Sequence, residues 1–212
     1  EQALAAAGFA VLAPSLPSTP GHGRKITNTQ RDTASLEDEL SDLADAVAAL
    51  QAHEGVDPDQ IAIVGRGAGG AMALLLAGAR PGLVRAAVAI DPVADWDAEF
   101  DQADDTWRAW HLRNLGLPAA SRAKHGLRSP TTFVGAVEVP LLLIGTDAVA
   151  PGRAAQLDAL TATMRDLGVS FTQDVAPGAI PWATAAHAAG FIRAIVGPNA
   201  ADPAEGMRTE GI

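Results

Sequence analysis

A short apolar strand that runs into a cluster of glycines and then into an apolar helix constrains this chain more than any other feature. The strand is predicted at 61–64, the glycine cluster covers 65–70 and the helix follows at 71–79. A fully apolar strand is typical of a parallel sheet that is covered on both faces. Glycines at such a joint allow a sharp turn and a close approach of strand and helix. We therefore expect an α/β unit whose functional loop lies at this joint.

The same alternation of strand and helix extends over most of the chain. The predicted strands are 9–13, 61–64, 84–90, 140–145 and 170–175, and the predicted helices are 1–7, 35–53, 71–79, 153–167 and 183–196. This order predicts a mainly parallel sheet with right-handed crossovers and helices on both faces. Residues 93–138 are expected to be irregular or weakly helical, 1–197 to form one domain and 198–212 a flexible tail.

Charge and composition exclude several classes of function. The chain has 212 residues, a formal net charge of −10 and no basic stretch, which argues against nucleic acid and anionic membrane surfaces. No apolar run approaches the roughly 18–20 residues that a membrane-spanning helix needs. Cysteine is absent, which removes thiolate metal sites and disulfides. We expect a soluble protein, with a cytoplasmic location favoured, and further residues upstream because Glu1 is not an initiator Met.

The glycine cluster itself has two interpretations. Gly65, Gly67 and Gly70 match the G-x-G-x-x-G fingerprint of dinucleotide-binding loops, and Asp91 ends the next strand where a ribose-binding acid belongs. The alternative is the nucleophile elbow G-x-S-x-G, which needs small residues around a sharp strand-to-helix turn. In that interpretation glycine stands at position 67, where the serine belongs.

The surroundings of the cluster favour the elbow. The chain resembles the catalytic domain of the prolyl-oligopeptidase family within the α/β-hydrolase superfamily, with some similarity to its dienelactone-hydrolase branch. The stretches that carry this resemblance are 5–14, 18–23, 56–65, 84–96, 128–130 and 139–145. The resemblance implies an α/β-hydrolase fold. It also implies that a strand absent from this chain lies between the first two predicted strands, so that the sheet lacks its N-terminal strands.

Three departures from the family pattern concern the catalytic triad. The nucleophile position falls on Gly67, and the histidine position falls on Ile180 or Pro181. The acid loop is about one residue short, and Asp147 is the remaining acid. Glycine cannot attack and proline or isoleucine cannot accept a proton, and loss of the nucleophile alone costs about 10⁶-fold in turnover in a comparable triad. The vestigial triad positions are thus Gly67, Asp147 and Pro181, and no catalytic residue is expected.

Three hypotheses about function remain. The first is a catalytically inactive hydrolase-fold protein, a structural, regulatory or ligand-binding subunit with a protein partner, a small-molecule ligand or a second copy. The second is an active esterase or peptidase that uses relocated residues such as His187, and the third is a dinucleotide-binding oxidoreductase. No metal or cofactor is expected, and the other histidines are expected at the surface. The pocket candidates are Arg66, Ala68, Asp91, Trp96 and Trp182.

Overall fold

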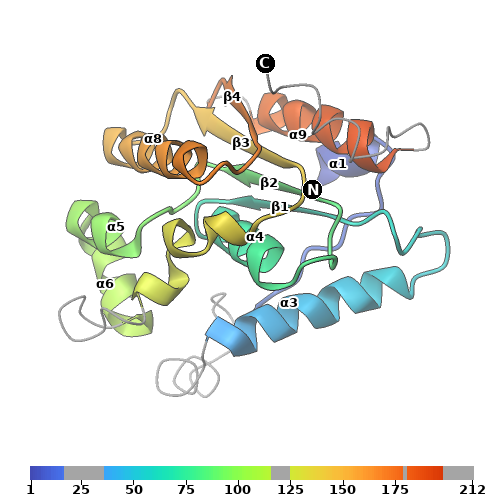
Figure 1. Cartoon of the computed structure of the whole chain (residues 1–212), viewed down its shortest axis with the longest axis horizontal. Coiled ribbons are helices and arrows are strands. Elements are labelled where there is room, and N and C mark those ends of the chain that lie inside the picture. The colour runs from blue at the N-terminus through green and yellow to red at the C-terminus, as the bar shows by residue number, and fades with distance from the viewer. Residues whose placement is uncertain (17–35, 116–124, 179–180, 198–212) are drawn as a thin grey trace.

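Four parallel strands form the centre of the molecule, in the order β1-β2-β3-β4. The computed structural model describes residues 1–16, 36–115, 125–178 and 181–197, and Figure 1 shows their arrangement. The strands are β1 Ala62–Arg66, β2 Ala86–Ile90, β3 Leu141–Thr146 and β4 Thr172–Ala176. Each agrees to within about two residues with a predicted strand. The proposed tail at 198–212 lies outside the described residues.

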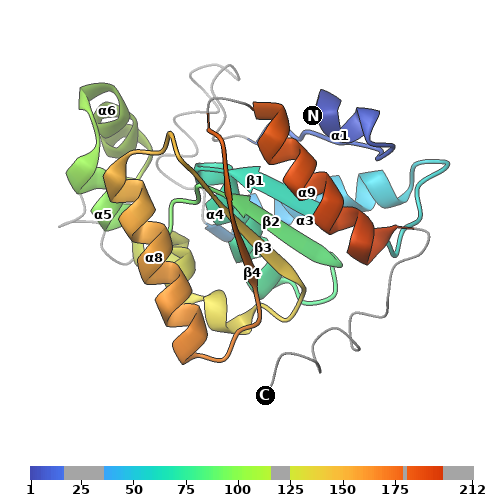
Figure 2. The same ribbon diagram turned by 90° about the horizontal axis from the view of Figure 1, so that it is seen from above.

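Helices cover both faces of this sheet, as expected for strands joined by crossovers (Figure 1, Figure 2). Helices α4 Ala68–Ala79 and α8 Pro151–Asp166 pack on one face, and α3 Leu36–Gln51 lies outside α4. Helices α1 Gln2–Ala6 and α9 Pro181–Val196 lie on the other face. Between β2 and β3 come α5 Trp96–Gln102, α6 Asp105–Asn114 and the 3₁₀ turns η1 Pro130–Thr132 and η2 Val134–Ala136.

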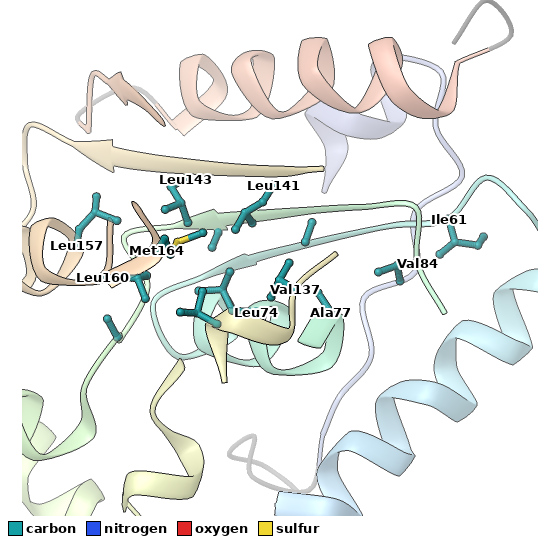
Figure 3. Close-up of a cluster of buried hydrophobic side chains, with 14 residues drawn as sticks. Ile61, Leu74, Ala77, Val84, Val137, Leu141, Leu143, Leu157, Leu160 and Met164 are labelled. Atoms are coloured by element: carbon teal, nitrogen blue, oxygen red, sulfur yellow. The ribbon is translucent and has the colours of Figure 1, made fainter. Parts of the chain in front are cut away.

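The side chains of β2 show how the strand alternation builds two cores. Ala87 and Ala89 face α4 and α8, where they join Leu74 and Leu160 in the cluster drawn in Figure 3. Val88 and Ile90 point the other way and pack with Ala188 and Ile192 of α9. Every residue of β2 is buried, which explains why its sequence is apolar at each position rather than at every second one.

Helix α4 is apolar on all sides because it has neighbours on all sides. It lies between the sheet, helix α3 and turn η2, and eight of its twelve residues are buried. Leu75 and Leu76 face Leu40 and Leu43 of α3, while Leu74 and Ala77 face the sheet. This central helix fixes the position of the turn that precedes it. No helix of the described residues is long and apolar enough to cross a membrane.

The strand predicted at 9–13 is wrong. These residues form no strand, and the side chains of Val11 and Leu12 are 39% and 46% exposed. An apolar run becomes a strand only when a neighbour supplies hydrogen bonds along its length, and β1 pairs with β2 alone among the described strands. A pocket separates Leu12 from the free edge of β1. The four described strands form one continuous sheet, and β1 lies at its edge.

Candidate functional site

The joint between β1 and α4 has the backbone of a nucleophile elbow. Gly67 precedes α4 with φ 58° and ψ −119°, a conformation that side-chain-bearing residues adopt only under strain. Its amide donates to the carbonyl oxygen of Ile90 at 2.9 Å, and its own carbonyl accepts from the amides of Ala71 and Val93, both at 3.1 Å. The turn is therefore fixed to both the helix and the end of β2.

Gly65 and Gly70, on either side of Gly67, are glycines for a reason other than a positive φ. A Cβ on Gly65 would overlap the carbonyl oxygen of Gly69 and lie 2.7 Å from the amide nitrogen of Gly70. A Cβ on Gly70 would lie 3.2 Å from Cα of Pro92. Gly65 and Gly70 thus permit a close approach of backbones, whereas Gly67 is required by its positive φ. This is the division of roles that a sharp strand-to-helix turn needs.

A guanidinium group lies where a nucleophile would project from this turn. A Cβ built on Gly67 would lie 3.4 Å from Nη1 of Arg153, which comes from the first turn of α8. Arg153 Nη1 donates to the carbonyl oxygen of Asp91 at 3.1 Å, and its Nε donates to Oε2 of Glu99 at 3.0 Å. Arg153 Nη2 also pairs with Glu99 Oε1. Arg153 is thus held from two sides next to Gly67.

Glu99 of α5 is the buried centre of this arrangement, with 6% of its surface exposed. Besides Arg153, it accepts from Gln156 Nε2 at 3.0 Å and from Trp107 Nε1 at 2.8 Å. Gln156 in turn accepts from the amides of Ala94 and Asp95, both at 3.1 Å. One carboxylate therefore joins α5, α6, α8 and the loop after β2. Sequence reasoning missed Glu99 and Arg153, which are 54 residues apart.

Asp91, a pocket candidate, ties the ends of two strands together. It is buried and has a positive φ of 42°. Its carboxylate accepts from the amide of Thr146 at 2.8 Å and from the Thr146 hydroxyl at 2.7 Å, and Arg66 Nη2 lies 3.4 Å away. The dinucleotide interpretation assigns this carboxylate to a ribose. In the structure its oxygens are engaged across the end of the sheet, and Arg66 is half exposed beside it.

Asp147, which sequence analysis assigned to the acid position, holds the loop after β4. Asp147 is exposed, and its Oδ1 accepts from the amide of Gly178 at 2.6 Å. Ile180 lies outside the described residues, and Pro181 begins α9. Trp182, proposed for the pocket, is 69% exposed. The Asp147 carboxylate therefore binds main chain in this structure.

A pocket of about 580 Å³ lies beside the elbow, along the unpaired edge of β1. Its walls come from the first turns of α4, from α3, from the extended residues after α1 and from a cluster of tryptophans. Of the proposed pocket residues it includes Ala68 and Trp96, while Arg66, Asp91 and Trp182 are not among its lining residues. The polar group in its wall is the buried pair Glu39–Arg128, whose Oε2 and Nη1 are 2.6 Å apart. The volume suits a small ligand or a short peptide segment.

Two histidines that were expected at the surface are fully buried, so that expectation is wrong. His111 and His125 are both 0% exposed, and their ring centroids lie 6.4 Å apart. His111 is packed among tryptophans, and burial lowers its pKa to about 4. The sequence does contain a signal, because Trp107 and His111 are four residues apart and share one face of a helix. His53 is exposed as expected, and His22 lies outside the described residues.

His187 lies on α9, away from the elbow turn, and pairs with Asp174 of the edge strand β4 through Nδ1 and Oδ2. The hydrogen bond from His187 lowers the pKa of Asp174. Both side chains are partly exposed. Among the described residues no hydroxyl hydrogen-bonds to His187, and no group of three or more acidic or histidine side chains is placed to hold a metal ion.

Comparisons with known proteins give a family match and several solved structures of similar fold. The family model described as the prolyl oligopeptidase family matches residues 1–179. A crystal structure of puromycin hydrolase superposes with a TM-score of 0.71 at 20% identity, covering 89% of this chain and 30% of that one. Dipeptidyl peptidase 4 of Porphyromonas gingivalis gives 0.68 at 19% identity, covering 84% and 25%. The acylaminoacyl peptidase of Pyrococcus horikoshii gives 0.63 at 18%, covering 76% and 26%. The chain thus spans about a quarter to a third of the length of these structures.

Proposed function

Because the chain belongs to the prolyl oligopeptidase family and has the α/β-hydrolase fold, we propose that it is a catalytically inactive member that acts by binding. The observation that carries this proposal is the elbow itself. Its backbone is formed, yet position 67 has no side chain and Arg153 lies 3.4 Å from where a Cβ would stand. An attacking oxygen is therefore missing at the one place where the fold presents it.

The rest of the triad supports the same conclusion. The base position falls on Ile180 or Pro181, neither of which can accept a proton, and Asp147 holds the amide of Gly178. A nucleophile without a base stays protonated, and a base without an orienting acid adopts the wrong tautomer. In this proposal Asp147, the retained acid, holds the loop at Gly178 in place.

A binding role is supported by the pocket beside the elbow. It is lined mainly by apolar side chains and includes one buried ion pair, a composition typical of ligand sites. Among the described strands, β1 has a partner on one side only. An extended peptide along its other edge, in the wall of the pocket, is able to hydrogen-bond to the backbone groups there. A protein partner, a second copy or a small apolar ligand are the binding partners consistent with these features.

The decisive experiment is labelling with a fluorophosphonate probe, applied to the protein and to Gly67→Ser. We expect no labelling of either form, because a serine at 67 would still have no base to remove its proton. The space is adequate, since the nearest atom to a Cβ is 3.4 Å away, but the positive φ should cost the variant about 1–3 kcal/mol. Its fold is checked by circular dichroism. Stoichiometric labelling of the unmodified protein would overturn the proposal, and labelling of the variant alone would reveal a hidden base.

One observation favours the competing proposal of relocated catalysis, namely the pairing of His187 with Asp174. If that pair served as a base, His187→Gln would abolish hydrolysis of any ester or peptide that the protein cleaves. We expect instead that a broad ester and peptide panel gives no turnover with either form. We also expect His187→Gln to change the unfolding free energy by less than about 1 kcal/mol, because the pair is partly exposed. Turnover that disappears with His187→Gln would establish the alternative.

A further inference from the structure

His111 is fully enclosed in the described part of the segment between β2 and β3. Four aromatic rings surround its imidazole, with centroids 5.3 to 5.8 Å away: those of Trp96, Phe100, Trp107 and Trp110. The side chain has no exposed surface. It belongs to α6, which together with α5 lies at one end of the molecule, away from α1 and α9 (Figure 1, Figure 2).

Neither ring nitrogen of His111 has a hydrogen-bond partner among the residues that the structure describes. A neutral imidazole offers one donor and one acceptor, and leaving both unpaired is costly. A protonated ring would bury two unpaired donors and a charge, which costs considerably more. The ring nitrogens of the neighbouring His125 likewise have no hydrogen-bond partner among the described residues, but its Nδ1 lies 2.8 Å from Oδ1 of Asp97, a charged neighbour whose side chain reaches solvent.

The charges around His111 do not compensate for this burial. On α5, Glu99 attracts a proton to the ring, but its oxygens are taken by Arg153, Gln156 and Trp107. Arg153 of α8 and His125 oppose protonation, and burial is the largest influence of all. Other charged groups among the described residues of this region are Asp95, Asp97 and Asp101 at or on α5, Asp104, Asp105, Arg108 and Arg113 at or on α6, and the Glu39–Arg128 pair in the wall of the same pocket.

The aromatic side of α6 packs against the rest of the molecule. Trp107 and Trp110 pack with Trp96 and Leu115, and Trp107 Nε1 donates to Glu99. The other side of α6 faces solvent, where Leu112 is 42% exposed. Hydrating His111 therefore requires that this helix move away from Trp96. We call Trp96, Trp107, Trp110 and Leu115 the aromatic end of the pocket, since all four line it.

We propose that α6 is an acid-released cover over the aromatic end of the pocket, and that protonation of His111 releases it. At neutral pH the uncharged ring lets α6 close over the tryptophans. In acid the imidazolium is accommodated only when water reaches it, so α6 moves outward. The movement exposes Trp107 and Trp110 and opens the pocket beside Ala68. The proposal deepens the binding role, because it states how access to that pocket is regulated, but it requires no statement about catalysis.

The direction and size of the effect follow from linkage. The pKa of His111 is lowered in the closed form, from 6.5 to about 4. The closed form is therefore fully favoured above pH 6.5 and loses its advantage as the pH falls through this interval. Between pH 7 and pH 4 the equilibrium between closed and open forms should shift toward the open form by about two orders of magnitude.

Acrylamide quenching of tryptophan fluorescence tests the proposal. The experiment uses a Trp182→Phe background, because Trp182 is 69% exposed and would mask the signal of the three less exposed tryptophans. We expect quenching to rise between pH 6.5 and pH 4 while far-ultraviolet circular dichroism stays native. His111→Leu keeps an apolar side chain that cannot titrate, and should abolish the rise. His53→Gln, which changes an exposed histidine, is the matched control and should leave it unchanged.

Two results would overturn the proposal. One is an equal rise in quenching with His111→Leu, and the other is loss of all helical signal together with the rise, which would mean global unfolding. If His111→Leu does not fold, the ring signals of the histidines are followed by NMR in the unmodified chain. A His111 titration that coincides with the quenching midpoint supports the proposal. Titration near 6.5 with the tryptophans still shielded overturns it. Labelling by the fluorophosphonate probe would overturn the proposed function, but it would not change the quenching results expected here.

Discussion

Gly65→Ala is expected to destabilise the protein by about 3 kcal/mol or more. The added Cβ would overlap the carbonyl oxygen of Gly69 and crowd the amide of Gly70. These are backbone atoms in the first turn of α4, so no side-chain rotation relieves the clash. Strand β1 and helix α4 would have to move apart, which would disrupt the packing of α4 on the sheet. Urea denaturation followed by circular dichroism measures the loss.

Gly69→Ala is the matched control for this prediction. It lies four residues further along the same joint, and a Cβ there meets nothing within 4 Å. Because alanine is the better helix former by roughly 0.5–1 kcal/mol, this variant should be as stable as the original chain or slightly more stable. Equal denaturation midpoints for the two alanine variants would show that strand and helix do not touch at Gly65.

The parts of the fold that sequence predicts correctly are those fixed by local pattern. Apolar runs such as 140–145 become strands because the sheet is covered on both faces, and α3 shows the helical spacing of Leu36, Leu40 and Leu43. The strand predicted at 9–13 has an equally good local pattern. It fails because strand formation depends on a pairing partner elsewhere in the molecule, and local composition carries no information about that partner.

The candidate site divides in the same way. The elbow at Gly67 could be predicted, because the strand, the glycine cluster and the helix are contiguous in sequence. Arg153 and Glu99 could not, since they are 54 residues apart and each is unremarkable on its own helix. His111 stands between these cases. Its spacing from Trp107 places both on one helix face, but whether that face is buried depends on what packs against it.

Glu99→Ala is expected to reduce the unfolding free energy by about 3–5 kcal/mol, because it removes one partner of a buried ion pair and leaves the other charge uncompensated. Arg153 would lose two of its contacts, and Gln156 Nε2 and Trp107 Nε1 would each lose their acceptor. The control is Asp101→Ala, which removes an exposed carboxylate from the same helix and should change stability by less than about 0.5 kcal/mol.

Comparing the stability and the tryptophan quenching of Glu99→Ala would show whether the hydrogen bonds of Glu99 only stabilise the fold or also hold α6 and Arg153 in position. If Glu99 merely stabilises the chain, the variant should unfold at lower urea with an unchanged tryptophan environment in the native state. The structure predicts more than this, because Glu99 fixes α6 through Trp107 and fixes Arg153 over Gly67. Native Glu99→Ala should therefore show greater acrylamide quenching already at pH 7, before any acid is added. Quenching identical to that of Asp101→Ala, with no loss of stability, would mean that the carboxylate holds neither the cover nor the guanidinium in place.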